Sequence, residues 1–324
     1  MEGFGELAPN GEGFVIGRPD TPQPWFNLLT NGRYSLLLTQ NGQANPGLGR
    51  ASILRPLFRF IYVRDLDTDQ FWALTGPPIS DKPNSYQCRY GINRCEFRLK
   101  YDQIDTTAEV FVPEDFDGEM WRIKIHNCGE KKRRLAIFFV AGLPDDINEA
   151  ANEKGVLIGR NRLDPSVTHF CASDHPFDSF DCLSEKFFGP STNLTAPKTV
   201  VEGRGNRSVA SGEKAILATT HNLTLGKNTA RQLVFLVGAT ADITAARRFV
   251  TQCKLPGAIE KTALKSSDAW RERLAGILIK TPDQNLNRLF NQFLKYQSLV
   301  TLNQSRLSSI QRLAVGLTLD QSKS

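Results

Sequence analysis

The sequence predicts a mainly β protein, a sandwich of two sheets, that ends in helices. Short segments with alternating apolar and polar residues follow one another up to about residue 240, without helical segments between them. Strands at such short spacing are typical of a sandwich and not of a fold in which strands and helices alternate. After about residue 240 the apolar residues recur with the period of a helix.

The strands begin after an extended segment, Arg18–Asn27, whose three prolines exclude a helix or an interior strand. Tyr34–Thr39 is the first long strand, and the polar, glycine-rich stretch Gln40–Arg50 is predicted as a loop. Glu119–His126 alternates cleanly, whereas Leu135–Val140 is apolar on both faces, as in a strand covered on both sides. Further strands are predicted at Phe58–Arg64, Gln70–Leu74, Tyr86–Tyr90, Arg94–Tyr101, Thr106–Val112, Val167–Ser173, Ala215–Thr220, Asn222–Leu225 and Gln232–Gly238.

Helices are predicted at Asp242–Cys253 and Ser267–Gly276, followed by a short extended piece and then by the strongest helix, Thr281–Gln297. Thr281 is the predicted N-cap, and Pro282 suits the first helical position. Because one side of this last helix is apolar, it needs a partner surface. The residues of this apolar stripe are Leu286, Leu289, Phe290, Phe293 and Leu294.

Composition favours an ordinary globular protein, with 40% hydrophobic and 23% charged residues in 324 positions. The apolar runs are too short to span a bilayer, so no membrane segment is expected. Met1–Asn10 lacks a basic start followed by an apolar run, which predicts no signal peptide and a cytoplasmic protein. The net charge of +6 is mild, and the basic runs Lys131–Arg134 and Arg204–Arg207 lack interleaved aromatics, so no nucleic-acid partner is expected.

Side chains that carry chemistry do not form a recognisable catalytic pattern in the sequence. The six cysteines contain no Cys-x-x-Cys pair and are expected to be reduced and mostly buried, without a histidine partner. The four histidines lack metal-binding spacing, so no metal site is predicted. No catalytic residue is assigned. The paired carboxylates all lie in loop-like stretches and are predicted as surface charge: Asp145 with Asp146, Glu114 with Asp115, and Asp178 with Asp181.

Several motifs together resemble the N-terminal part of the cellobiose and chitobiose phosphorylase family. These are inverting glycoside phosphorylases, formerly glycosyltransferase family thirty-six, and the family includes a domain of cyclic β-glucan synthases. The longest motif is Arg18–Tyr34, which is similar to the family's R-P-D-T-P-x-P-W-x-N-x-L-x-N-G-R-Y. Ile61–Asp65, Tyr86–Gly91 and Phe187–Pro190 also match, and the resemblance extends from about residue 11 to about residue 315.

The resemblance implies three regions: a galactose-mutarotase-like β supersandwich at 11–240, a helical linker at 241–280, and the start of a truncated (α/α)6 barrel at 281–324. In the family the barrel carries the general-acid aspartate. Inorganic phosphate is a co-substrate that attacks the anomeric carbon, and no cofactor is implied. The rest of the barrel has no counterpart in this sequence, so Thr281–Gln297 corresponds to the first helix of a missing barrel.

The sequence departs from the family pattern where sugars are held. Arg306 matches the first arginine of a sugar-binding pattern and is the single substrate-binding candidate, whereas Leu317 and Lys323 stand at the second arginine and the aspartate. Asn148–Asn152 carries alanines where the family has an acceptor-recognition segment, and Gly42–Arg50 replaces an aromatic and charged loop.

The resemblance therefore implies a carbohydrate-binding or structural N-terminal domain of a β-glucoside (cellobiose-type) phosphorylase, inactive alone. Its partners would be a β-linked gluco-oligosaccharide and a second copy of the chain or a separate barrel chain. The alternative is one part of a split phosphorylase that releases a sugar 1-phosphate once a separate barrel chain completes it. A third hypothesis, a mutarotase-like epimerase, requires a histidine and glutamate pair across the sandwich, for which His126, His169 and His221 are the candidates.

Overall fold

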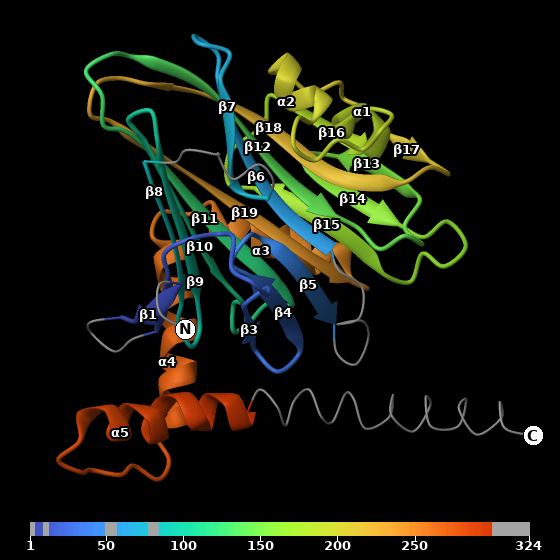
Figure 1. Ribbon diagram of the computed structural model, residues 1–324. Helices are drawn as coiled ribbons and strands as arrows, with labels where there is room; N and C mark the ends of the chain where they lie inside the picture. Colours follow the sequence, from blue (N-terminus) through green and yellow to red (C-terminus); the bar gives the residue numbers. More distant parts are fainter. Residues whose placement is uncertain (1–3, 9–12, 49–56, 77–83, 300–324) are drawn as a thin grey trace, which may run out of the picture.

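Two antiparallel sheets packed face to face make up most of the computed structural model, which describes residues 4–8, 13–48, 57–76 and 84–299. Figure 1 shows the long strands of both sheets crossing the molecule, with short helices at the top and longer helices behind and below. Arg306 lies outside the described residues, as does all of 300–324. None of the described helices is long and apolar enough to cross a membrane.

The larger sheet has 11 strands in the order β1-β2-β8-β9-β10-β11-β19-β15-β14-β13-β17, and the smaller sheet has eight strands. The order in the smaller sheet is β16-β18-β12-β6-β5-β4-β3, with β7 also paired to β6. The larger sheet contains β1 (Gly5–Leu7), β2 (Phe14–Ile16), β8 (Ser85–Tyr90), β9 (Cys95–Tyr101), β10 (Ile104–Phe111), β11 (Gly118–Asn127), β13 (Glu149–Glu153), β14 (Val156–Arg160), β15 (Thr168–Ser173), β17 (Ala210–Ser211) and β19 (Ala230–Thr240). The smaller sheet contains β3 (Phe26–Thr30), β4 (Tyr34–Thr39), β5 (Gln43–Leu48), β6 (Leu57–Asp65), β7 (Phe71–Thr75), β12 (Arg133–Gly142), β16 (Ser179–Leu183) and β18 (Ala215–Leu225).

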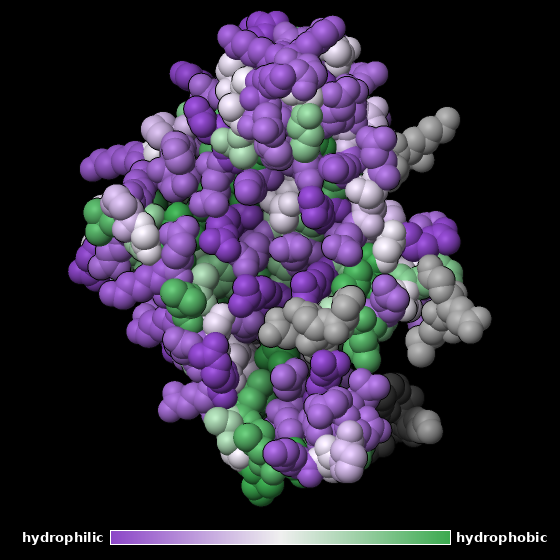
Figure 2. Space-filling view, turned by 90° about the vertical axis from the view of Figure 1, so that its left-hand side faces the viewer, coloured by the Kyte–Doolittle hydropathy of each residue, from purple (hydrophilic) through white to green (hydrophobic). Residues whose placement is uncertain are grey.

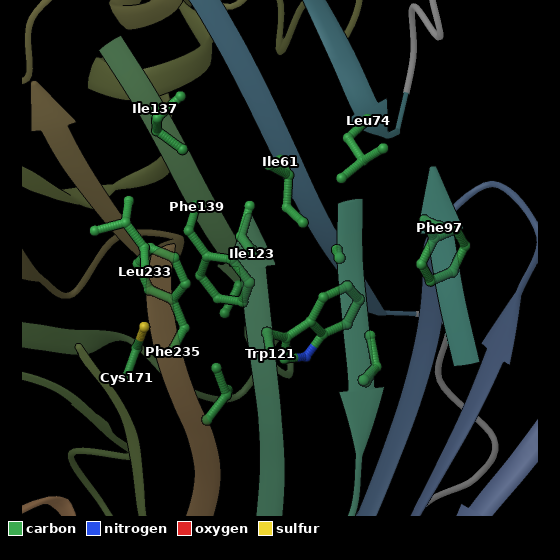
Figure 3. Close-up of a cluster of buried hydrophobic side chains, with 14 of the residues drawn as sticks. Ile61, Leu74, Phe97, Trp121, Ile123, Ile137, Phe139, Cys171, Leu233 and Phe235 are labelled. Carbon is green, nitrogen blue, oxygen red and sulfur yellow. The ribbon is translucent and has the colours of Figure 1, made fainter. Parts of the chain in front are cut away.

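The main hydrophobic core lies between the two sheets (Figure 3). Phe139 on β12 stacks on Phe235 on β19 with ring centroids 4.4 Å apart, so the two rings join the sheets directly. Trp121 on β11 meets Phe139 edge to face at 5.7 Å. Aromatic pairs in these geometries contribute attraction beyond the area that they bury.

Helices cover the outer faces of both sheets and give the molecule four layers. On the 11-stranded sheet, α3 (Ile243–Cys253) and α4 (Ala258–Leu274) contribute Val250 and Ile259 to a second apolar cluster. On the eight-stranded sheet, α1 (Ser184–Phe188) and α2 (Lys198–Glu202) contribute Phe187, Phe188 and Val200 to a third.

The mainly β fold class is confirmed. In β11, Trp121, Ile123 and Ile125 face the main core, as their alternation predicts. In β12, alternate residues face the main core and the cluster under α1, which explains why Leu135–Val140 is apolar on both faces. The division at residues 240 and 280 stays a prediction, although the last strand ends at Thr240 and α3 begins at Ile243.

Several local predictions were wrong. The stretch predicted as a loop, Gln40–Arg50, contains β5, because its backbone pairs with β4 from Ala44 to Leu48. The segment before residue 240 is not entirely β, since α1 and α2 lie within it. The helix predicted at Ser267–Gly276 begins earlier, at Ala258.

The last helix comprises α5 (Gln284–Arg288), the π-helix η1 (Leu289–Leu294) and the helical residues 295–299, and is called the terminal helix below. Its N-cap is Asp283 and not Thr281, because the Asp283 carboxylate accepts hydrogen bonds from the backbone N–H groups of Asn285 and Leu286. Much of the predicted apolar stripe is exposed, and Figure 2 shows hydrophobic surface at the lower end of the molecule, where this helix lies. The exposed residues are Leu286, Leu289, Phe290 and Leu294.

Candidate functional site

A groove of about 540 Å³ lies between the β8–β9 turn, α4 and the terminal helix. It is the place where the sandwich, the following helices and the terminal helix meet, and it brings together segments that are far apart in the sequence. Its lining residues are Arg89, Gly91, Ile92, Asn93, Arg94, Glu96, Glu109, Ser267, Trp270, Arg271, Leu274, Ala275, Leu278, Asn291 and Gln292.

The sandwich wall of the groove is an ordered polar network. The guanidinium of Arg94 donates to the carboxylate of Glu109 at 3.1 Å and to the hydroxyl of Ser267 on α4 at 3.1 Å. The amide of Asn93 donates to the same hydroxyl at 2.8 Å. Glu109 also pairs with Arg122, so its negative charge is shared by two arginines. These contacts hold the β8–β9 turn against α4.

The opposite wall is held by two asparagines on the terminal helix. Asn291 accepts from the backbone N–H of Ile279 at 2.9 Å and donates to the carbonyl of Ile279 at 2.8 Å. Asn287 makes the same two bonds to Thr281, at 2.7 and 2.8 Å. Residues four apart on a helix are about 6 Å apart along its axis, which matches two residues of an extended chain. The spacing therefore lets both amides bond the backbone that leads into the helix.

The floor of the groove is apolar and belongs to a fourth cluster of buried residues. Trp270 on α4 meets Tyr296 at 5.3 Å and donates its indole N–H to the carbonyl of Thr30 at 3.2 Å. The Tyr296 hydroxyl bonds to Asn27 at 2.9 Å and to the carbonyl of Leu28. Buried tyrosine and tryptophan usually find such partners for their polar atoms. These contacts fix the terminal helix on β3.

The lining of the groove suits a neutral ligand that has many hydroxyl groups. Guanidinium and amide groups can donate, carboxylate and amide oxygens can accept, and Ile92, Leu274 and Leu278 offer apolar surface. Three arginines face two glutamates, so the charge is close to balanced. A concave site with an apolar part and a few polar groups is the usual form of a small-molecule site.

The buried carboxylates of the described residues are all engaged by partners. Glu119 pairs with Arg59, Asp65 with Arg133, Asp105 with Arg98, and Glu109 with Arg94 and Arg122. Asp181 accepts from the hydroxyls of Thr199 and Ser208 and from the backbone of Asn206. A general acid for cleavage of a glycosidic bond must instead face the bound sugar.

The predicted surface carboxylate pairs are mostly on the surface. Glu114 pairs with Arg273 and Asp115 with Lys265, both on α4. Asp145 and Asp146 are exposed. Asp181 is the exception: it lies in β16 and is 1% exposed, so its prediction as a loop residue with surface charge was wrong. Its hydroxyl and amide partners come from α2 and from the segment after α2, which nothing in the local sequence indicates.

The epimerase hypothesis gains no support from a direct contact between a histidine and a glutamate. Within the described residues, no histidine side chain hydrogen-bonds a glutamate. His221 lies between the rings of Phe177 and Phe235, and burial lowers its pKa to about 4. Burial also lowers the pKa of His169 to about 4, with a further contribution from the positive charge of Arg59.

All six cysteines are free thiols, and five of them are buried. The prediction that no cysteine has a histidine partner was wrong, because the sulfur of the exposed Cys128 lies 3.4 Å from Nδ1 of His126. His126 lies on β11 and Cys128 directly follows this strand, so their spacing of two residues places both side chains on one face, which the sequence could have indicated.

A family model described as "Glycosyl hydrolase 94, supersandwich domain" matches residues 12–143 and 147–256. Among curated proteins, a 3-O-beta-D-glucopyranosyl-beta-D-glucuronide phosphorylase of Paenibacillus borealis is 26% identical over 95% of this chain. An N,N'-diacetylchitobiose phosphorylase of Vibrio furnissii is 24% identical over 94% of this chain. The chain spans 42% of the length of each of these relatives.

A solved structure with a similar fold is that of a bacterial glucoamylase complexed with acarbose. Its TM-score is 0.53 at 8% sequence identity, over 82% of this chain and 40% of that chain. This likeness concerns the arrangement of the strands and helices and nothing further.

Proposed function

Because this chain belongs to the glycosyl hydrolase 94 family through its supersandwich domain, we propose that it is the carbohydrate-binding part of a β-glucoside phosphorylase. The observation that carries the proposal is the family match over most of the chain, together with relatives that are named as phosphorylases. The ligand class is a β-linked gluco-oligosaccharide, and the groove beside Arg94 and Trp270 is where we place it.

The groove supports this ligand class through its chemistry. A gluco-oligosaccharide is neutral, carries donors and acceptors around each ring, and has apolar ring faces. The polar side chains of Asn93, Arg94 and Gln292 suit the hydroxyl groups, and Ile92 and Leu278 suit the ring faces.

We propose that the chain does not catalyse phosphorolysis by itself. Attack of inorganic phosphate on an anomeric carbon needs a carboxylic acid to protonate the leaving oxygen, and the buried carboxylates described above are held in other contacts. The second candidate is a split phosphorylase, in which a separate barrel chain supplies the acid and the phosphate site. The chain spans 42% of the length of each of these relatives, and this partial coverage is the reason to test the split enzyme.

The cytoplasm is the compartment that we propose for this function. All six thiols are free, and free thiols are typical of a reducing compartment.

A second copy of the chain, as a homodimer, remains part of the proposal and is tested by the mass of the purified protein in solution.

The test combines binding and turnover on the purified chain. We expect cellobiose and longer cello-oligosaccharides to bind, measured by calorimetry, and the variant Asn93→Ala to weaken binding about tenfold, or about 1.4 kcal/mol. The matched control Lys132→Ala, outside the groove, should bind like the wild type.

The same samples are incubated with inorganic phosphate, and no glucose 1-phosphate is expected. Release of glucose 1-phosphate by the chain alone would disprove the inactive domain. Activity that appears only with an added barrel chain would establish the split enzyme. Absence of binding by every oligosaccharide would remove the carbohydrate-binding role.

A further inference from the structure

Cys128, His126 and Asn228 form a three-residue cluster at one end of the 11-stranded sheet. The sulfur of Cys128 lies 3.4 Å from Nδ1 of His126, and Nε2 of His126 lies 2.9 Å from the side-chain oxygen of Asn228. Cys128 is the exposed one of the six cysteines. The cluster lies outside the groove described above and is not used by the proposed function.

The hydrogen bond to Asn228 determines which nitrogen of His126 faces the thiol. An amide oxygen only accepts hydrogen bonds, so Nε2 of the neutral ring must carry the proton. The lone pair of Nδ1 then points to Cys128 and can accept the thiol proton. A nucleophile beside a base, with the base oriented by a third group, is the arrangement that activates a thiol.

The backbone around the cluster is fixed by its own hydrogen bonds. The N–H of Cys128 donates to the carbonyl of Gln103 at 2.8 Å, and the amide of Asn127 bonds to the carbonyl of Lys131 at 2.7 Å. Asn228 has a φ of 49°, a left-handed conformation that asparagine tolerates better than most residues. Cys128 and Asn228 are therefore presented by ordered turns, and His126 is presented by β11.

Charged groups around the cluster suit a negatively charged reagent. Arg98 on β9 is bonded to Asp105 on β10, which lies opposite His126 in the sheet register. Lys131 and Lys132 line an adjoining cavity of about 710 Å³ together with two arginines and three acidic residues, so four positive charges face three negative ones. Neither lysine forms an ion pair among the described residues. Glu130 in the same turn is paired with Lys227. An excess of positive charge attracts an anionic reagent.

We propose that Cys128 is a reactive thiol that forms a mixed disulfide with a negatively charged, low-molecular-weight disulfide. His126 takes the proton of the Cys128 thiol, and the thiolate attacks one sulfur of the disulfide. The new S–S bond forms as the old one breaks, the leaving thiolate takes a proton from His126, and one free thiol is released. The disulfide is the oxidant, so electrons and atoms balance.

The test measures the rate of mixed-disulfide formation by mass spectrometry, with oxidised glutathione as the anionic probe and cystamine as the cationic one. We expect Cys128 to react at least about tenfold faster than the five buried cysteines and to prefer oxidised glutathione at low salt. Cys128→Ser should remove the fast reaction, and His126→Gln should slow it about tenfold at pH 7.

The dependence of the reaction rate on pH distinguishes a thiol that His126 activates from a thiol that is only exposed. Asn228→Ala should slow the reaction, because His126 loses the group that orients it. The control His175→Gln changes an exposed histidine elsewhere and should leave both rate and profile unchanged. The proposal is overturned if His126→Gln reacts with the rate and profile of the wild type. A preference for cystamine would overturn the assigned charge of the reagent.

Discussion

Arg59 and Glu119 form an ion pair inside the sandwich, where both side chains are almost completely buried. Glu119 accepts hydrogen bonds from Arg59 at 2.7 Å, from the hydroxyl of Tyr34 at 3.2 Å and from the indole N–H of Trp121 at 2.8 Å. Because Arg59 lies on β6 and Glu119 on β11, the pair links the two sheets. A buried pair of this kind depends on both partners, since either charge alone would be buried without compensation.

We therefore expect Glu119→Gln to lower the free energy of unfolding by about 3–5 kcal/mol, because the charge of Arg59 stays buried without a counter-charge. The matched control is Asp117→Asn, which breaks the exposed pair with Arg33 and should cost less than about 1 kcal/mol. Urea unfolding of both variants measures the difference. Equal losses for the two variants would contradict the prediction.

His221 makes the stability of the protein depend on pH. Its folded-state pKa of about 4 lies below the ordinary value of 6.5, chiefly because of burial, and Nε2 has no hydrogen-bond partner among the described residues. The unfolded chain thus binds the proton more readily than the folded protein. The free energy of unfolding is therefore highest above pH 6.5, where His221 is neutral in both states, and falls as the pH drops toward 4. The negative charges of Asp174 and Asp178 raise the pKa of His221, but they offset only part of the lowering that burial causes.

We expect this single group to cost the wild type about 2 kcal/mol of stability between pH 7 and pH 5. In His221→Leu that part of the pH dependence should disappear, although the variant differs in overall stability. The measurement is the urea unfolding free energy of both proteins at a series of pH values. Parallel curves for the two proteins would show that His221 is not the group responsible.

At the scale of elements, the terminal helix is held by a few polar contacts and a small apolar cluster. Tyr296 is 8% exposed and packs on Trp270, whereas Phe290 and Leu289 are each 45% exposed. The face that docks is therefore centred on Tyr296 and not on the most apolar stripe. The π-helical geometry of Leu289–Leu294 lies within this segment, and such geometry often marks functional positions in helices.

We expect Tyr296→Phe to lower the free energy of local unfolding of the terminal helix by about 1–2 kcal/mol. The reason is that the acceptor oxygens of Asn27 and Leu28 stay buried without the hydroxyl that they bond. Amide hydrogen exchange in 284–299 should become about tenfold faster, while the strands exchange as before. The control Phe290→Tyr adds a hydroxyl on the exposed face and should leave exchange unchanged. Unaltered exchange in Tyr296→Phe would show that the apolar contacts alone hold the helix.

The sequence predicts those elements in which the spacing of the apolar residues matches the faces that are buried. β11 and β12 were predicted because apolar residues alternate or fill both faces. β5 was missed because its pairing with β4 sets its conformation, and α1 was missed because the burial of Phe187 and Phe188 stabilises a helix of only five residues.

The sites were harder to predict, because they depend on contacts between distant segments. Arg94 and Ser267 are 173 residues apart, and His126 and Asn228 are 102 residues apart. A pattern within a short stretch of sequence cannot indicate contacts between residues so far apart. The one substrate-binding residue assigned from the sequence, Arg306, lies outside the described residues and stays a prediction.

At the scale of the whole molecule, the two sheets share one core. The contact between Phe139 and Phe235 and the ion pair between Arg59 and Glu119 both cross between the sheets. Neither sheet can separate from the other without exposing the same apolar surface. The two sheets should therefore unfold together, as domains with a single core usually do.

Phe139→Ala tests this cooperativity. Removing the ring leaves a cavity against Phe235 and Trp121, and we expect a loss of about 3–5 kcal/mol. Native-state hydrogen exchange should report the same loss for amides in β18 of the smaller sheet and in β10 of the larger sheet. Leu264→Ala, at a position that is 64% exposed, should cost less than about 0.5 kcal/mol and serves as the control. If only β18 lost protection in Phe139→Ala, the sheets would be separate units, and the shared core would not be what holds the sandwich together.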